Sequence, residues 1–472
     1  MKSAKTIACL LIILSAAGFC QKKELTVELA TKKASTLAPK KLHQLQWRPS
    51  ENEFTFVQDS SLIQENTKSD SKETILSLSK LNEKYFEAVK QTLSSFPDIE
   101  WTDKDNFRFW NNDSLWDYNI SGNDLKLINS TNSGAENLDC TLQNMAAYTI
   151  KNNLYISVNN EQKQVTNDDN EGIVNGQYCA RNEFGIDKGT FWSPSGNYLA
   201  FYRKDQTMVT DYPIVDISFH PAKLVNIKYP MAGMTSEQVT LGVYDLKSGK
   251  TTFLNTGEPK DHYLTGVAWD PDEKYVYIGI LNRDQDHLCE IKYDITTGNA
   301  IDTLFQETNS KYVQPMHGAI FVEKHPDEFI WISRRDGWNH LYLYSNNGKL
   351  IKQLTKGEWE VTDLNGFDAK GEIAYFTATK ESPLEMNYYS VNIESGKVTR
   401  LTNEPGVHEV VKDKDGKYFL DSYSSLSVPG KVLLIDSKAK VERTVLESEN
   451  TLKDYNIGQT KFFTLKSNDG FD

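Results

Sequence analysis

One strand-and-turn phrase recurs along much of the chain, and it limits the possible folds more than any other feature. Each copy has an aromatic residue before a polar turn, then a strand of alternating apolar residues and a second turn. Copies begin at Trp192 (WSPSGNYLAFYRKD), Val267 (VAWDPDEKYVYIGILNRDQ), Phe329 (FIWISRRDGWNHLYLYSNNGKLIKQLT) and Phe367. Their spacing of roughly 40 to 50 residues is the length of a four-stranded propeller blade.

The repeat predicts an all-β fold built as a β-propeller. Short strands with regular turns also build β-sandwiches, but a sandwich does not repeat one strand, turn and strand phrase so many times. Aromatic residues make up 11% of the chain, which suits a β-rich protein. The formal net charge of −13, without a basic stripe, argues against nucleic acid or an anionic membrane as the main partner.

One segment departs from the strand pattern. In SKLNEKYFEAVKQTLSSFP, the residues Leu81, Tyr85, Ala88 and Leu93 fall near helical spacing, and Pro97 is expected to end the run. The sequence therefore predicts a short helical insertion between early strands.

The first residues are typical of a secretory signal peptide. Two lysines precede an apolar run from Ile7 to about Ala17, which is too short to span a membrane. We expect residues 1–20 to be this signal and the protein to be periplasmic or secreted. A lipid anchor through Cys20 is the alternative, although Phe19 stands where a lipoprotein signal has a small residue. No later segment is apolar enough to cross a bilayer.

Cysteines and histidines give no sign of a disulfide framework or a metal site. Beyond the signal, Cys140, Cys179 and Cys289 are far apart and odd in number. One bridge between Cys140 and Cys179 stays open beside the simpler interpretation of three isolated core thiols. The eight histidines lack His-Glu-x-x-His spacing, and no glycine-rich phosphate or dinucleotide motif occurs, so we expect neither a metal nor a cofactor.

Catalytic motifs are also missing. No Gly-x-Ser-x-Gly elbow occurs, so the nucleophile of an α/β-hydrolase is not in this chain. Paired carboxylates such as Asp168 and Asp169, or Asp270 and Asp272, lie in polar phrases where Asp is expected as a turn former. A propeller glycosidase would need two carboxylates at the channel mouth, and no spacing singles out such a pair.

Four phrases in this order carry a resemblance: GTFWSPSGNYLAFYRKD, IKYPMAGMTSEQVTLGVYD, VAWDPDEKYVYIGILNRDQ and WISRRDGWNHLYLY. Together they resemble the propeller of the dipeptidyl peptidase IV subfamily of prolyl oligopeptidase-type serine peptidases. The Arg-x-Glu-Phe-Gly form at residues 181–185 is most similar to bacterial dipeptidyl and prolyl tripeptidyl peptidases. The resemblance implies an eight-bladed propeller over residues 45–460, and an N-terminal arm or linker over residues 21–44 that packs on a further domain.

That further domain is an α/β-hydrolase domain, which in the family follows the propeller. Residues 461–472 resemble its lead-in, so we expect the catalytic Ser, Asp and His beyond Asp472 and the chain to be inactive alone. The implied protein is a secreted serine exopeptidase that releases di- or tripeptides after Pro or Ala, with the propeller gating the substrate. The alternative is a free-standing peptide-binding propeller. Whether the protein forms a homodimer stays open.

The resemblance also implies a substrate-binding residue. In this subfamily a loop from an early blade carries Glu side chains that bind the free α-amino group of the peptide, and Glu183 matches that position. A carboxylate suits the task because charge-assisted hydrogen bonds are strong, and a fixed amine sets the bond that is cleaved. Dipeptidyl peptidases usually have two adjacent Glu, whereas Asn182 precedes Glu183 here, which leaves room for a tripeptide register.

Two residues near these phrases, Glu183 and Arg108, need a further comment. The simpler interpretation of Glu183 is a surface acid paired with Arg181. The family's substrate-carbonyl Arg has no convincing motif match around NFRFWNND, so Arg108 receives no ligand role.

Overall fold

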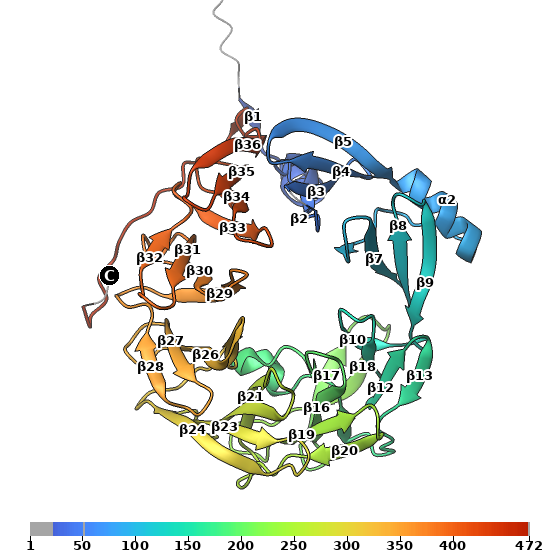
Figure 1. The fold of residues 1–472 in the computed structure, drawn as a ribbon, viewed down its shortest axis with the longest axis vertical. Helices are drawn as coiled ribbons and strands as arrows, with labels where there is room; N and C mark the ends of the chain where they lie inside the picture. The colour runs from blue at the N-terminus through green and yellow to red at the C-terminus, as the bar shows by residue number, and fades with distance from the viewer. Residues whose placement is uncertain (1–21, 51, 471–472) are drawn as a thin grey trace, which may run out of the picture.

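The structure is a computed structural model that describes residues 22–50 and 52–470. Over these residues, eight antiparallel sheets stand around a central opening, each forming one blade of a propeller (Figure 1). The first strand of a blade lies nearest the opening and the last lies at the rim. The predicted all-β fold and the eight blades are confirmed. The predicted signal over residues 1–20, with Cys20, lies outside the described residues.

The first three blades are built from consecutive strands, and the fourth is interrupted by the hairpin β17–β18. Blade 1 contains β2 (His43–Trp47), β3 (Glu53–Gln58), β4 (Ser61–Asn66) and β5 (Ser69–Ser77). Blade 2 contains β6 (Glu100–Trp101), β7 (Asn106–Asn111), β8 (Ser114–Asn119) and β9 (Asp124–Ser130). Blade 3 contains β10 (Glu136–Cys140), β11 (Ala146–Ile150), β12 (Asn153–Val158) and β13 (Glu161–Gln164). Blade 4 contains β14 (Ile173–Asn175), β15 (Thr190–Trp192), β16 (Tyr198–Asp205), β19 (Gln238–Asp245) and β20 (Lys250–Phe253).

The last four blades are more regular. Blade 5 contains β21 (Tyr263–Trp269), β22 (Tyr275–Leu281), β23 (His287–Asp294) and β24 (Ala300–Thr308). Blade 6 contains β25 (Ile320–Val322), β26 (His325–Ser333), β27 (His340–Ser345) and β28 (Leu350–Gln353). Blade 7 contains β29 (Val361–Phe367), β30 (Ile373–Ala378), β31 (Asn387–Asn392) and β32 (Val398–Arg400). Blade 8 contains β33 (Val407–Lys412), β34 (Tyr418–Ser424), β35 (Lys431–Asp436) and β36 (Val441–Glu447).

A few elements lie outside the blades. They are the parallel pair β1 (Lys23–Glu24) and β37 (Tyr455–Asn456), the hairpin β17 (Asp211–Asp216) and β18 (Lys223–Lys228), the helices α1 (Val27–Thr31) and α2 (Leu78–Val89), and the 3₁₀ segments η1 (Ala34–Leu37) and η2 (Ala180–Gly185).

Tryptophans of the repeated phrase bind neighbouring blades together. The indole N–H of Trp192 donates to Asp139 O of blade 3 at 3.1 Å, and that of Trp269 donates to Phe191 O of blade 4 at 3.0 Å. In the same way, Trp331 Nε1 donates to Glu307 Oε1 of blade 5 at 2.8 Å. A buried indole needs a hydrogen-bond partner, and here the preceding blade supplies it.

The ring closes between blades 8 and 1 through side chains. Trp47 Nε1 donates to Val411 O at 2.9 Å. The carboxylate of Glu65, which is buried, accepts a hydrogen bond from Arg443 Nη2 at 2.7 Å. The parallel pairing of β1 with β37 ties the start of the described chain to the segment after blade 8, next to this junction (Figure 1).

The predicted helical insertion is confirmed as α2, between blades 1 and 2, but its predicted end is wrong. The helix stops at Val89 because Lys90 adopts a left-handed conformation (φ 60°) as its C-cap. Asn82 then exchanges two hydrogen bonds with the backbone of Leu93, at 3.1 and 2.7 Å, which turns the chain away from the helix axis. Pro97 lies well beyond this point, so it does not end the helix.

The cysteines are free thiols among the described residues, so the open possibility of a bridge between Cys140 and Cys179 is not realised. Burial raises the pKa of Cys140 to about 11 and that of Cys179 to about 12. Both side chains are therefore neutral, unreactive thiols near neutral pH.

Candidate functional site

The innermost strand of blade 4 is divided into β14 and β15, and the loop between them contains η2. Arg181, Asn182 and Phe184 have positive φ angles of 51°, 65° and 55°. Non-glycine residues seldom adopt this conformation, and such strain persists only where the surroundings enforce it. Glu183, in the middle, is extended, with φ −74° and ψ 159°. The loop therefore holds Glu183 in one defined conformation.

Blade 5 holds the loop from one side. Thr265 Oγ1 donates a hydrogen bond to Phe184 O, and the Phe184 ring packs on Tyr263 with 4.8 Å between ring centroids. Gly185 lies close to the segment of this chain that runs from blade 5 to blade 6, and an added Cβ would be 2.1 Å from Met316 O. Its φ of +70° also favours glycine. These contacts explain why Phe and Gly follow the Glu in the sequence phrase.

The chain around β17 and β18 holds the loop from the other side. The Arg181 guanidinium lies 4.3 Å from the centroid of the Tyr229 ring, a cation–π geometry. The N–H of Ala180 donates to Glu237 Oε1 at 3.4 Å. The alternative interpretation, in which Glu183 is a surface acid paired with Arg181, finds no ion pair between these two described residues, and Arg181 has this aromatic partner instead.

The Glu183 side chain is exposed, and its carboxylate makes no hydrogen bond or ion pair with any described residue. It faces a pocket of about 440 Å³ together with Asn182. The opposite wall comes from blade 5 and from the segment that leads into blade 6, and its polar members are Gln285, Tyr312 and Gln314. The structure therefore brings Glu183 and Asn182 together at one pocket with an unpaired carboxylate.

A second carboxyl group lies in the sheet that supports this loop. Glu290 of β23 is 0% exposed, and both of its side-chain oxygens lack a hydrogen-bond partner. It pairs across the sheet with Gly279, which pairs in turn with Thr265, the residue bonded to the loop. Burial raises the pKa of Glu290 well above its usual value, and the charge of Glu307 raises it further. Both causes favour the protonated, neutral form of the Glu290 carboxyl group.

Arg108, to which the sequence analysis gave no ligand role, lies in a charged cluster of blade 2. Arg108 on β7 is 5% exposed and donates to Glu100 Oε2 from Nε and Nη2, at 3.0 and 2.7 Å. Its Nη1 donates to Thr141 O, Leu142 O and Asn144 Oδ1, at 2.8, 3.2 and 2.7 Å. Arg108 joins blades 2 and 3 and uses all three guanidinium nitrogens in hydrogen bonds within the fold.

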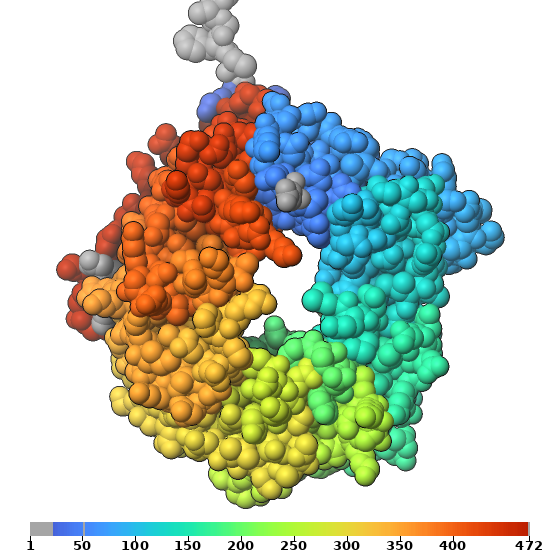
Figure 2. Space-filling model, in the orientation of Figure 1, coloured from blue at the N-terminus to red at the C-terminus, as the bar shows by residue number. Residues whose placement is uncertain are grey.

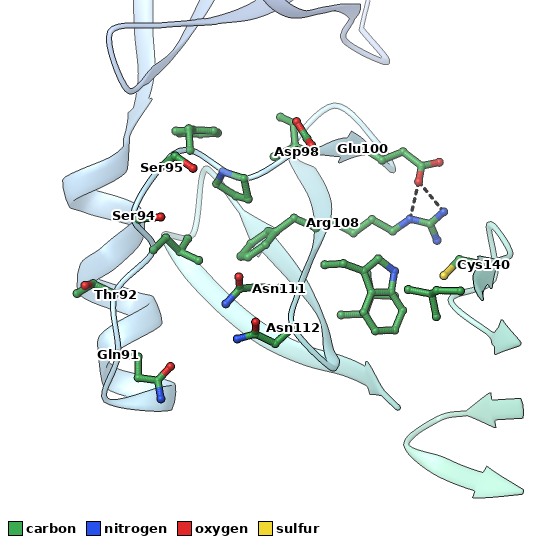
Figure 3. A pocket seen from close by; sticks show the side chains of 18 of the residues that line it. Gln91, Thr92, Ser94, Ser95, Asp98, Glu100, Arg108, Asn111, Asn112 and Cys140 are labelled. Atoms are coloured by element: carbon green, nitrogen blue, oxygen red, sulfur yellow. Dashed lines mark hydrogen bonds and ion pairs between the residues drawn. The ribbon is translucent and has the colours of Figure 1, made fainter. Parts of the chain in front are cut away.

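A larger cavity, of about 880 Å³, lies beside Arg108 rather than at Glu183 (Figure 3). The chain between α2 and β6 forms one wall, and β7 and β10 form the others. Sequence reasoning missed this cavity, and it missed the Tyr312 and Gln314 wall of the smaller pocket. Neither segment carries the repeated phrase or a motif that could have identified it.

Other kinds of site are not found in the part of the chain that the structure describes. There, no group of three or more His, Cys, Asp or Glu side chains is arranged to hold a metal ion. Over the same residues, no helix combines the length and apolar character that a bilayer crossing requires.

Residues 95–430 match the family model described as the dipeptidyl peptidase IV (DPP IV) N-terminal region. A curated relative from Aspergillus fumigatus, named "Probable dipeptidyl peptidase 4", is 26% identical over 340 residues, which cover 68% of this chain and 44% of the relative. The chain thus spans less than half the length of this relative.

Two solved structures share the fold. The Bacteroides ovatus protein assigned as a dipeptidyl aminopeptidase IV has a TM-score of 0.87 and 36% identity, covering 96% of this chain and 66% of that one. Porphyromonas gingivalis dipeptidyl peptidase 4 has a TM-score of 0.77 and 22% identity, with the same two coverages of 96% and 66%. At the latter identity, the likeness concerns the fold alone.

Proposed function

The chain belongs to the family of the dipeptidyl peptidase IV N-terminal region, and from this premise we propose that it is the substrate-gating propeller of a secreted serine exopeptidase. In this proposal Glu183 binds the free α-amino group of a peptide. The peptidase releases di- or tripeptides after Pro or Ala. The signal at residues 1–20 directs the protein to the periplasm or the outside of the cell.

The unpaired Glu183 carboxylate is the observation that carries this proposal. An exposed carboxylate usually needs no explanation, but this one stands on a strained loop that two neighbouring segments hold in place. Strain of this kind collects at binding sites, where it fixes a group before the ligand arrives. An ammonium group of a peptide supplies the opposite charge and the donors that the carboxylate lacks.

A fixed amine-binding group works as a ruler for cleavage. If Glu183 holds the amine, only the peptide bond at one distance from it reaches the nucleophile. Asn182, with φ 65°, occupies the preceding position and brings an uncharged amide where a second carboxylate would stand. One carboxylate restrains the amine less tightly than two, so we propose that the enzyme accepts a tripeptide register as well as a dipeptide register.

The ring itself provides the gate. Figure 2 shows an opening through the centre of the molecule that is narrow compared with the ring around it. Extended peptides fit through such an opening, whereas folded domains do not. The catalytic Ser, Asp and His belong, in this proposal, to an α/β-hydrolase domain that follows the propeller and acts through an acyl-enzyme.

Steady-state kinetics of the complete peptidase test the anchor. Glu183→Gln keeps the shape of the side chain but removes the charge, so we expect kcat/KM for free-amine peptides to fall by about tenfold or more. N-acetylated peptides should change little. Glu409→Gln, which removes an exposed charge from the innermost strand β33, is the matched control and should leave both substrates unaffected. An equal loss for free and acetylated peptides would refute the anchor.

The hairpin β17–β18 supports a homodimer as a further part of the proposal. Its two strands pair with each other and with no other described strand. Its exposed apolar side chains are Tyr212, Ile214, Val215, Ile217, Phe219, Leu224 and Val225. Exposed apolar side chains gathered on one hairpin favour an interaction site, and a two-fold axis lets two copies cover the same surface on each other.

Sedimentation velocity of the chain tests the dimer. We expect a dimer that dissociates when Ile217→Asp and Leu224→Asp are combined, since these two side chains are 78% and 71% exposed. Leu127→Asp, at an exposed apolar position on β9, is the control and should leave the dimer intact. A monomeric wild-type chain would contradict this part of the proposal.

A further inference from the structure

The innermost strand of blade 2, β6, is shorter than β7, the strand with which it pairs. β6 pairs with β7 at only two positions, Glu100 with Arg108 and Trp101 with Phe107. β7 continues to Asn111, so its last three residues have a strand partner on one side, β8, and none on the other. Blade 2 therefore presents an open strand edge toward the inside of the ring.

The register tells which backbone groups face this edge. Asn111 and Ser114 close the β7–β8 hairpin around a two-residue turn, so the backbone of Asn111 points to β8. Alternation along an antiparallel strand then turns the N–H and C=O of Trp110 to the other side. There β6 offers no partner, and no loop of the described chain bonds to the Trp110 backbone.

The chain that could have extended β6 is held elsewhere. Gln44 of β2 donates from Nε2 to Pro97 O at 2.9 Å and accepts from Ile99 N at 2.9 Å. Asn82 of α2 binds both backbone groups of Leu93. These two amide side chains fix the course of the chain between α2 and β6. The open edge is thus built into the blade by contacts with blade 1 and α2.

The space in front of the edge is the cavity of about 880 Å³, a volume typical of ligand pockets. Figure 3 shows Asn111 and Asn112 on one side and Ser94, Ser95 and Asp98 on the chain opposite. Three strand residues span about 10 Å, which matches three or four residues of an extended partner. Arg108, the one cation in the cavity wall, already donates to Glu100 and to three acceptors that follow β10, and Asp98, Glu100 and Asp139 add carboxylates to the wall.

We propose that the open edge of β7 binds an extended segment of the peptide substrate as an added strand. A strand edge is recognised by another backbone in extended conformation, because only that presents donors and acceptors at the matching spacing. The identity of the ligand as a peptide rests on the proposed function. The cavity wall also connects with the Glu183 loop, since Asp139 accepts from Thr190 Oγ1 at 2.9 Å at the start of β15.

Calorimetric titration of the 472-residue chain tests the added strand. The probes are a ten-residue peptide that begins Ala-Pro and continues with alternating Thr and Ser, its N-acetylated form, and its N-terminal tripeptide. We expect the long peptide to bind about tenfold more tightly than the tripeptide, the effect of one or two added hydrogen bonds. Equal affinities of the two lengths would overturn the proposal.

Two variants at one position identify the backbone group. Trp110→Pro and Trp110→Ala both remove the indole, but only Pro removes the N–H at the open edge, where the β7–β8 ladder is not involved. The ten-residue peptide should still bind more tightly than the tripeptide in Trp110→Ala, and this difference in affinity should disappear in Trp110→Pro. Equal behaviour of the two folded variants would overturn the proposal.

A measurement on the unchanged protein covers the case in which Trp110→Pro does not fold. Single N-methyl groups are moved along the ten-residue peptide, each removing one donor. Binding should weaken at every second position, as strand alternation requires, and a flat profile would overturn the added strand.

Acetylation separates this inference from the Glu183 anchor. If the N-acetylated ten-residue peptide still binds more tightly than the tripeptide, the result supports binding at the strand edge even if the Glu183 anchor is wrong. If acetylation weakens binding and the ten-residue peptide binds no more tightly than the tripeptide, the result supports the Glu183 anchor and overturns binding at the strand edge.

Discussion

The innermost strands of blades 2 and 4 are both incomplete, yet they leave different groups free. In blade 2 the charged side chain is consumed by the fold, because Arg108 donates to blade 3 and to Glu100. What remains free there is backbone, along the last residues of β7. In blade 4 the backbone is bent into left-handed conformations and bonded to blade 5, and the Glu183 carboxylate remains free.

This contrast teaches how a propeller makes room for ligands. A complete innermost strand satisfies its backbone by pairing and points its side chains into neighbouring blades. Interrupting that strand releases either backbone or side chain, depending on what the interrupting loop bonds to. The two interruptions lie on the inner wall of nearby blades, which suits one elongated ligand.

The largest effect should come from breaking the blade 2 arrangement. Arg108→Met keeps the bulk of the side chain but leaves buried acceptors of blade 3 without a donor, so we expect a loss of about 2–4 kcal/mol in the free energy of unfolding. Urea unfolding measures it. Lys126→Met, which removes an exposed ion pair with Asp124 on β9, should change stability by less than about 0.5 kcal/mol. Equal effects of both changes would show that Arg108 does not join the blades.

A smaller effect, dependent on pH, is expected in the sheet that supports the blade 4 loop. The pKa of Glu290 is raised in the folded state by burial, so the unfolded chain releases this proton at lower pH than the folded chain does. Between these two pKa values the folded state binds more protons, and stability falls as pH rises. Glu290→Gln removes this dependence and should raise Tm at pH 8 by about 2 °C while changing it little at pH 4.

Thermal unfolding at the two pH values measures the Glu290 effect. Glu171→Gln, at an exposed position ahead of β14, is the control and should show no such difference. If Glu290→Gln lowers Tm equally at both pH values, the carboxyl group has a hydrogen-bonding role that the structure does not show.

The smallest effect concerns the contact between Arg181 and Tyr229. Tyr229→Leu removes the aromatic ring under the guanidinium, a contact of about 0.5–1 kcal/mol, and should raise KM for free-amine peptides about two- to fivefold. Tyr229→Phe keeps the ring and should behave like the wild type. An unchanged KM in Tyr229→Leu would mean that the contacts with blade 5 and Glu237 fix the loop without the aromatic ring.

Local sequence patterns were enough to predict the propeller architecture and to draw attention to the Glu183 part of the candidate site. The repeated aromatic and turn phrases predicted a propeller because each blade must bury the same alternating strands and pack a tryptophan at the same place. The matched phrase around Glu183 predicted the position of the candidate anchor. The same kind of reasoning misjudged the end of α2, since a left-handed Lys90 and the amide of Asn82 turn the chain long before Pro97.

The sequence by itself determined the repeating blades and the helix between the first two blades, because these depend on periodicity, while the resemblance to the family singled out Glu183. Only the tertiary structure decided that Glu183 is unpaired, that Glu290 is a buried acid, and that β7 has an open edge. Each of these depends on partners distant in the chain, such as Thr265 for the loop and Gln44 for the segment before β6. A hydrogen bond made elsewhere, or not made at all, leaves no local pattern in the sequence.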